Sequence, residues 1–281
     1  MKQLRLPSFR HILRGAVGVA GALALCLSCV LAAGTGGFYP EAGKTLYSDS
    51  GTTVDATNKN KGYFRAKQKT ITKKVKLRVK LDSTQLDYDL TANDEYEVFP
   101  FQLGDGTYSV LTYKQVSGKK YSAAFSKKIK VQLEDEFLPF LCPNQYVWYT
   151  PDSQVVKKAE ELCAGLTDDK EKFTAVGLYL KNNIMYDFFT AMQITSGVIT
   201  VYLPDLDNAL ETKKGICFDY AALFSAMMRS QGIPCKLIIG HADKTFHAWV
   251  SAYINGTWLN FDPTFASTGG RASTYTAERW Y

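Results

Sequence analysis

Alternating apolar and polar residues dominate the chain between residues 63 and 141 and predict short, half-buried strands. The clearest run lies within residues 70–81, and its apolar side chains occupy every second position: Val75, Leu77, Val79 and Leu81. Similar but shorter runs are expected at residues 96–100, 100–103, 107–111, 121–125 and 129–133, with a turn at Asp105-Gly106. This spacing indicates a small β-sandwich-like domain, which we place at residues 63–150.

From residue 151 the apolar residues recur at helical intervals instead. The spacing predicts helices over residues 152–165 and 168–186, the second with Thr167 as its N-cap, and then a loop over residues 187–207. A short helix is expected at residues 208–213. The last and most apolar helix begins at Cys217 and ends before Gly232 and Pro234, which favour a C-cap and block continuation.

Three short strands follow this helix, at residues 236–240, 248–254 and 257–261. Asn255-Gly256 separates the last two and is a strong signal for a tight hairpin turn. Helices followed by a strand meander predict an α+β domain over residues 151–281, with helices packed on an antiparallel sheet.

The N-terminal segment has the charge pattern of a targeting sequence. Four basic residues and no acidic residue precede an uncharged, apolar stretch that ends near Ala33. Residues 1–33 therefore predict a signal peptide or an uncleaved N-terminal anchor, with Cys29 leaving a lipoprotein anchor as an alternative. Residues 34–62 are rich in small and polar residues and predict a flexible linker. We expect a secreted or extracytoplasmic protein that meets a membrane only through this N-terminal segment.

Composition excludes some partners. The chain is 46% hydrophobic and carries a formal net charge of +6, but the basic N-terminal segment supplies most of this excess. The rest is close to neutral, so we expect no nucleic-acid partner. The basic residues that alternate with the apolar ones in residues 73–80 either contact anionic wall or lipid material, or simply face solvent.

Four cysteines lie beyond the N-terminal segment, and only one has a position that suggests chemistry. Cys142 and Cys163 either form a disulfide across the expected domain boundary or remain two packed thiols. Cys235 lies in an apolar run and is expected in the core. Cys217 stands at the first turn of a buried helix, where free N–H groups and the helix dipole favour a thiolate over a thiol.

His247 and Asp262 make Cys217 a candidate nucleophile. His247 opens the first strand of the predicted hairpin and Asp262 ends the second strand, so both lie at the same end of the hairpin. A thiolate needs an imidazole to carry a proton, and the imidazole needs a third group on its other nitrogen. Taken singly, each of the three residues also fits an ordinary structural role.

An oxyanion at this site would need hydrogen-bond donors. The Cys217 N–H supplies one, and the Tyr186 side chain is our candidate for the second. His241 is expected in a loop. No group of histidines, cysteines or carboxylates has the spacing of a metal site, and no phosphate-binding or calcium-binding motif occurs, so no metal or cofactor is expected.

Four segments, in this order, resemble the core of the transglutaminase-like superfamily: GICFDYAAL, GIPCKLIIG, FHAWV and WLNFDPT. The resemblance covers about residues 152–265 and implies a papain-like thiol site. Cys217 would be the nucleophile, His247 the general base and acid, and Asp262 the orienting carboxylate. Asp219 and Tyr220 match the family pattern and would be structural. The region before the core, with NQYV at residues 144–147, resembles the leading domain of secreted bacterial members.

The resemblance implies an extracytoplasmic cysteine enzyme that attacks protein or peptide amides through a thioester, and either water or an amine completes the reaction. Its partner would be a protein or peptide substrate, such as a cell-wall or surface protein. The alternative is a catalytically inactive member of the superfamily that binds or scaffolds at the cell surface.

Overall fold

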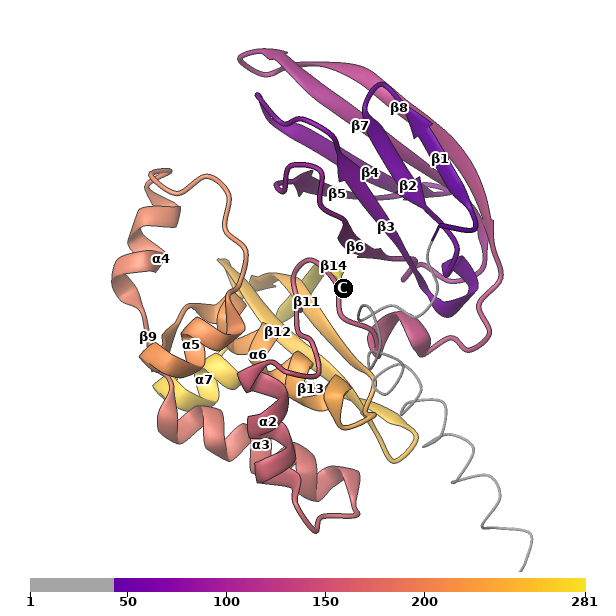
Figure 1. The fold of residues 1–281 in the computed structure, drawn as a ribbon. Helices are drawn as coiled ribbons and strands as arrows, with labels where there is room; N and C mark the ends of the chain where they lie inside the picture. The colour runs from indigo at the N-terminus through magenta and orange to yellow at the C-terminus, as the bar shows by residue number, and fades with distance from the viewer. Residues whose placement is uncertain (1–42) are drawn as a thin grey trace, which may run out of the picture.

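The computed structural model of the chain describes residues 43–281, so the expected leader at residues 1–33 lies outside the described part. Two four-stranded antiparallel sheets come first and form the two layers of a β-sandwich (Figure 1). Their strand orders are β1-β2-β3-β6 and β5-β4-β7-β8. The strands are β1 (Leu46–Asp49), β2 (Thr52–Asp55), β3 (Tyr63–Gln68), β4 (Val75–Leu81), β5 (Thr84–Leu90), β6 (Glu97–Pro100), β7 (Gly106–Ser117) and β8 (Lys120–Val131).

Alternation along the strands builds the core of the sandwich. The apolar positions predicted in β4 are all buried, while the residues between them are half-buried or exposed. Phe64, Phe99 and Phe101 are fully buried and form a cluster of ring contacts. The hydroxyls of Thr52 and Thr112 lie 2.9 Å apart and join the two sheets through a buried hydrogen bond. The prediction of a β-sandwich ahead of an α+β core is therefore confirmed.

The expected linker at residues 34–62 is wrong for its described part. Residues 46–55 form β1 and β2, a 3-10 helix follows at Lys59–Lys61, and Val54 is fully buried. These strands give no apolar alternation in the sequence, because small and polar residues fill buried positions. Thr52, for example, is buried through hydrogen bonds and not through apolar packing. The two strands expected within residues 121–133 are also one strand, since residues 126–128 stay paired with β7.

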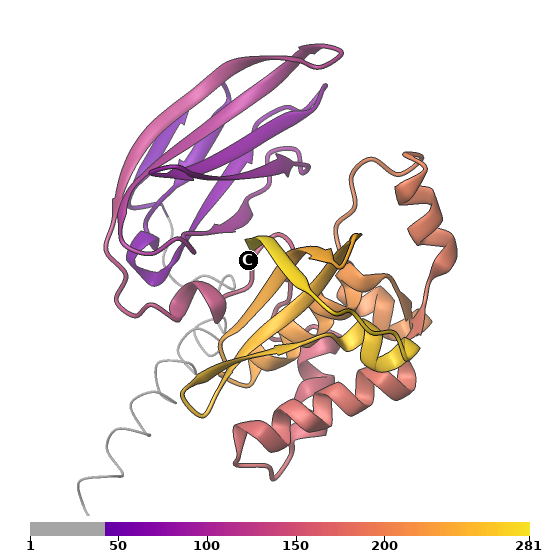
Figure 2. The same cartoon turned by 180° about the vertical axis from the view of Figure 1, so that it is seen from behind.

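The second part of the chain packs helices on a four-stranded antiparallel sheet of order β13-β12-β11-β14 (Figure 2). α6 packs on β11 and β12, and α2, α3 and α7 surround α6. The helices are α2 (Gln154–Cys163), α3 (Asp169–Asn183), α4 (Phe188–Thr195), α5 (Leu206–Thr212), α6 (Cys217–Ser230) and α7 (Pro263–Thr268), and a short 3-10 helix covers Leu138–Phe140. The strands are β9 (Met185–Tyr186), β10 (Lys214–Gly215), β11 (Cys235–Ala242), β12 (Thr245–Ile254), β13 (Thr257–Phe261) and β14 (Tyr275–Trp280).

Several details differ from the sequence prediction. Asp168, not Thr167, caps α3 by accepting hydrogen bonds from two backbone N–H groups. The expected loop at residues 187–207 contains α4, in which Phe188, Phe189 and Met192 are exposed and no residue is fully buried. β14 was not predicted, because residues 275–280 expose four of their six side chains and lack apolar alternation. It is nevertheless an edge strand of the sheet.

All four cysteines in the described part of the chain are free thiols, so Cys142 and Cys163 are packed and not paired. Within residues 43–281 there is no helix with the length and apolar character that crossing a bilayer requires.

The sandwich and the α+β part share one buried apolar cluster. Gln102 of the sandwich donates hydrogen bonds to the Tyr88 hydroxyl and to the backbone oxygen of Trp280. The rings of Tyr88, Tyr146 and Tyr281 contact one another and form one cluster. The proposed division into residues 63–150 and 151–281 stays a prediction, since the core does not break at residue 150.

Arg229 of α6 ties the second part together. It is fully buried, and its guanidinium donates hydrogen bonds of 2.7–2.9 Å to the backbone oxygens of Cys142, Cys235 and Tyr281. One side chain thereby connects α6 to β11, to the segment after the sandwich and to the residue that follows β14.

Replacing Arg229 by glutamine should destabilise the protein by about 3 kcal/mol or more, because three buried backbone oxygens would lose hydrogen bonds from the guanidinium. Chemical denaturation measures the loss. Arg78→Gln is the matched control. Arg78 pairs with Asp87 at the surface, so its replacement should lower the free energy of unfolding by about 1 kcal/mol or less. Equal stability of the two variants would contradict this role for Arg229.

Candidate active site

Cys217 is the first residue of α6, as the sequence predicts. The helix start is fixed by Asp219, whose Oδ2 accepts a hydrogen bond of 2.8 Å from the Ile216 N–H. Gly215 makes this approach possible, since a Cβ at that position would lie 2.7 Å from the Asp219 Cβ. Cys217 is partly exposed, whereas the other three described cysteines are buried. Of these four thiols, Cys217 alone is therefore open to a substrate.

His247 lies in β12 beside the end of β13, and the hairpin register brings it to Asp262. The imidazole is 5% exposed, and its Nε2 lies 2.7 Å from Oδ2 of Asp262. Asp262 is itself held in place because it is the N-cap of α7, where its Oδ1 accepts a hydrogen bond of 2.9 Å from the Phe265 N–H. The Phe265 ring stacks on the imidazole, with centroids 4.7 Å apart.

The other side of the imidazole meets the thiol. Burial disfavours the charged imidazolium, but hydrogen bonds with Asp262 and Cys217 outweigh it and raise the pKa of His247 from 6.5 to about 9. Because Nε2 is taken by Asp262, Nδ1 is the nitrogen left for the sulfur. The structure thus brings Cys217, His247 and Asp262 together, with a ring that is charged at neutral pH.

Tyr186 lies in the same cavity as Cys217 and His247. It belongs to β9, which pairs in parallel with β10 and places Tyr186 opposite Gly215, two residues before the cysteine. Burial raises the pKa of Tyr186 to about 12, so its hydroxyl keeps its proton at neutral pH and can donate a hydrogen bond. Its role as an oxyanion donor stays a prediction.

Asp219 and Tyr220 have structural contacts. Asp219 is buried, and besides the Ile216 N–H it accepts a hydrogen bond of 2.7 Å from the Tyr202 hydroxyl. Burial raises the pKa of Asp219 to about 6 despite these two donors. The Tyr220 hydroxyl donates to the backbone oxygen of Ile184. Both residues anchor the start of α6 to neighbouring loops.

Tyr275 is a site residue that sequence reasoning missed. Its hydroxyl donates a hydrogen bond of 2.9 Å to Oδ2 of Asp262, the same oxygen that meets His247. Only the pairing of β14 with β11 brings it there, and the mainly polar sequence of β14 offered no signal.

His241 stands apart from this group of residues. It lies in β11 and not in a loop, and its Nδ1 is 3.2 Å from Oε1 of Glu278. Within residues 43–281 no cluster of three side chains could hold a metal ion.

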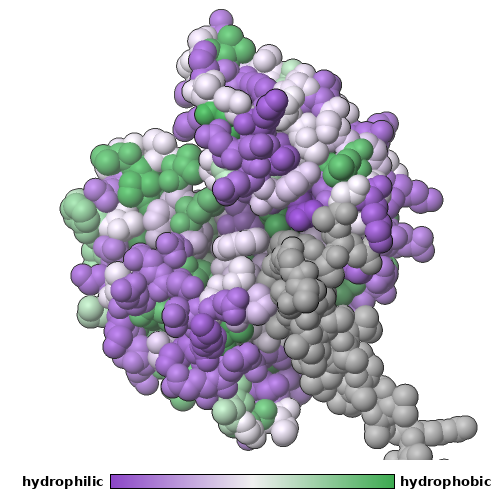
Figure 3. Space-filling view, viewed as in Figure 1, coloured by the Kyte–Doolittle hydropathy of each residue, from purple (hydrophilic) through white to green (hydrophobic). Residues whose placement is uncertain are grey.

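The cavity at Cys217 has a volume of about 370 Å³, and its remaining walls are largely apolar. Ala191 and Ile194 of α4 line it, together with Val201 from the loop that follows. On its outer side α4 exposes further apolar side chains, which form a hydrophobic surface beside the cavity (Figure 3): Phe188, Phe189 and Met192. The site can therefore accept an apolar group next to the reactive thiol.

Comparison with known proteins agrees with this geometry. Residues 156–263 match the sequence model of the transglutaminase-like superfamily, so this part of the chain is a transglutaminase-like domain. The match spans the cysteine, the histidine and the aspartate and supports an enzyme of the thiol class.

Individual relatives are distant. The human kyphoscoliosis peptidase is 28% identical over 144 residues, which are 45% of this chain and 21% of that protein. The uncharacterized protein ML0607 of Mycobacterium leprae is 28% identical over 142 residues, 46% of each chain. The chain thus spans less than half the length of these curated relatives. Among solved structures, a candidate cysteine protease from Cytophaga hutchinsonii is 16% identical, covers 78% of each chain and superposes with a TM-score of 0.41.

Asp262→Asn should lower the pKa of His247 from about 9 towards or below 6.5, because burial would then be opposed by the Cys217 hydrogen bond alone. The amide oxygen of asparagine still caps α7, so the fold should persist. NMR titration of the His247 ring measures the shift. Asp82→Asn, which removes a carboxylate from the exposed β4–β5 turn, is the control and should leave the titration unchanged.

Proposed function

We propose that this protein is a cysteine enzyme that attacks amide bonds of proteins or peptides and forms a thioester. The observation that carries the proposal is the grouping of three residues: Cys217 and His247 line the same cavity, and His247 is hydrogen-bonded to Asp262. Each group is held by its own element: the start of α6, the strand β12 and the N-cap of α7.

The reaction follows from the protonation states. The thiolate of Cys217, paired with the imidazolium of His247, attacks the amide carbonyl to give a tetrahedral oxyanion. The imidazolium then donates its proton to the departing amine, and the C–N bond breaks to leave an acyl-thioester. The neutral imidazole next takes a proton from water or from an acceptor amine, which attacks the thioester. The thiolate leaves, and the starting ion pair is restored.

The start of α6 supports the charged intermediates. The first N–H groups of a helix have no partner within the helix, so the Cys217 N–H can donate to the oxyanion. The positive end of the helix dipole also favours the thiolate. Tyr186 lies in the same cavity with a protonated hydroxyl and is the candidate for the second donor. No metal or cofactor takes part in this mechanism.

The acceptor decides between hydrolysis and cross-linking, and we propose that the enzyme uses water, an amine or both. The extracytoplasmic location, the signal peptide or anchor and a cell-wall or surface protein as substrate remain part of the proposal. They are supported by the charge pattern of residues 1–33, which lie outside the described residues.

Thiol labelling resolved by residue tests the proposal. Iodoacetamide should modify Cys217 much faster than Cys235 at pH 7, because Cys235 is fully buried and burial raises its pKa to about 11. Digestion and mass spectrometry measure both rates in one sample. An inert Cys217 would favour the inactive, scaffolding alternative.

Turnover is tested with casein as substrate, with and without a fluorescent primary amine. Incorporation of the amine reports acyl transfer. Release of ammonia or of new amino termini reports thioester formation, and release without incorporation of the amine reports hydrolysis. Cys217→Ala should lose at least about a thousandfold in rate, since every step passes through the sulfur. Cys235→Ala is the matched control and should keep most of the activity. Unchanged turnover by Cys217→Ala would contradict the proposal.

A further inference from the structure

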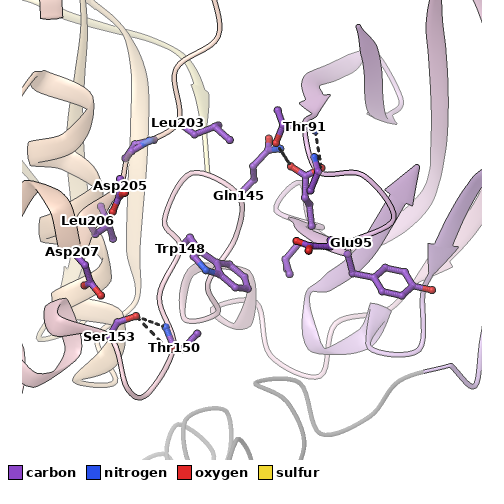
Figure 4. A pocket seen from close by; sticks show the side chains of 15 residues that line it. Thr91, Glu95, Gln145, Trp148, Thr150, Ser153, Leu203, Asp205, Leu206 and Asp207 are labelled. Carbon is purple, nitrogen blue, oxygen red and sulfur yellow. Dashed lines mark hydrogen bonds between the residues drawn. The ribbon is translucent and has the colours of Figure 1, made fainter. Parts of the chain in front are cut away.

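A second cavity, of about 690 Å³, lies between the β-sandwich and the transglutaminase-like domain. Figure 4 shows it from close by, with Trp148 in the middle, Glu95 on the sandwich side and Asp205 and Asp207 on the helical side. We call it the acidic cavity. It does not include Cys217, His247 or Asp262, and the mechanism above makes no use of it.

The charge of this cavity has one sign. Its lining holds four carboxylate side chains, contributed by both parts of the chain, and no lysine or arginine: Glu95, Glu97, Asp205 and Asp207. This contrasts with the net charge of +6 of the whole chain. In the described part of the chain the Glu95 carboxylate is exposed and has no ion-pair or hydrogen-bond partner. The cavity is therefore complementary to a cation.

Gln145 provides a second and independent indication of a ligand. It is 7% exposed and lines the acidic cavity, and its Oε1 has no hydrogen-bond partner among the described residues. The amide orientation is fixed, because Nε2 donates to two acceptors, the backbone oxygen of Asp89 at 2.7 Å and Oε1 of Glu97 at 2.6 Å. A buried acceptor without a partner is uncommon, and a ligand N–H would satisfy it.

Trp148 adds an aromatic surface. Its side chain is 42% exposed even though it stands in the cavity between the two parts of the chain. An indole ring beside carboxylates adds to the attraction of ammonium and guanidinium groups. The carboxylates and the unpartnered carbonyl acceptor of Gln145 together match the chemistry of a lysine or arginine side chain.

The acidic cavity adjoins the catalytic one. Leu203 lines both cavities. Asp89, whose backbone oxygen receives the hydrogen bond from Gln145, also lines the catalytic cavity. The two cavities are therefore neighbours that meet at Leu203.

We propose that the acidic cavity binds a lysine or arginine side chain of the peptide substrate and so selects cationic substrates. This inference rests on the proposed function, because it takes the bound peptide to be the substrate of the enzyme. The binding itself needs no reactive thiol. The β-sandwich then takes part in substrate selection, because it contributes Glu95 and Glu97 to the site.

Binding is tested with the full chain carrying Cys217→Ala, so that no reaction accompanies it. The probe is the peptide acetyl-Ala-Lys-Ala-Lys-Ala-amide, and its partner is the same peptide with both side-chain amines acetylated. Calorimetric titration at low salt should give at least tenfold tighter binding of the charged peptide. Equal affinity for the two peptides would overturn the proposal.

Charge-neutralising variants locate the binding. Glu95→Gln combined with Asp205→Asn should weaken binding of the charged peptide at least fivefold. Asparagine can still cap α5 as Asp205 does, so the helix should persist. The matched control is Asp82→Asn with Glu160→Gln, two exposed acidic residues outside the cavity, which should change the affinity by less than twofold. Equal weakening by both pairs would mean diffuse attraction and would overturn the assignment to this cavity.

The two proposals fail separately. Charge-selective binding with an inert Cys217 would refute the enzyme and leave the acidic cavity in place as a binding site. A reactive Cys217 without charge-selective binding would refute only the proposal for the acidic cavity.

Discussion

Arg229 is the interaction on which the arrangement of the α+β part depends. A buried guanidinium is costly unless each donor finds an acceptor, and here the acceptors are backbone oxygens from three separate segments. The side chain fixes the C-terminal half of α6 against β11. Because α6 carries Cys217 at its other end and β11 pairs with the strand of His247, the same contact sets the frame for the catalytic residues.

Within that frame, Asp262 organises the site. One oxygen caps α7, and the other meets both His247 and Tyr275. The carboxylate is thus held from three sides, which orients the imidazole towards the thiol. The raised pKa of His247 follows from this arrangement: burial works against the charge, and the hydrogen bonds with Asp262 and Cys217 outweigh burial.

The β-sandwich is more than a spacer in front of the domain. Asp89 of β5 lines the catalytic cavity, and residues 91, 92 and 95–98 line the acidic cavity. The contact between the two parts is made by aromatic rings and by Gln102, which bonds to the backbone next to Tyr281. Substrate selection and catalysis would therefore be divided between the two parts, with Leu203 and Gln145 at the boundary.

The sequence by itself determined the local elements and the order of the reactive residues. The helix from Cys217, the Asn255-Gly256 turn with both φ angles positive, and the nearness of His247 to Asp262 follow from short-range patterns. Tertiary structure alone decided that Tyr275 reaches Asp262, that β1 and β2 belong to the sandwich, and that Gln145 and Glu95 share a cavity with Asp205. These features depend on contacts between residues far apart in the chain, often through polar or exposed side chains. Such contacts leave no period in the sequence, because a hydrogen bond across the fold does not require apolar residues at regular intervals.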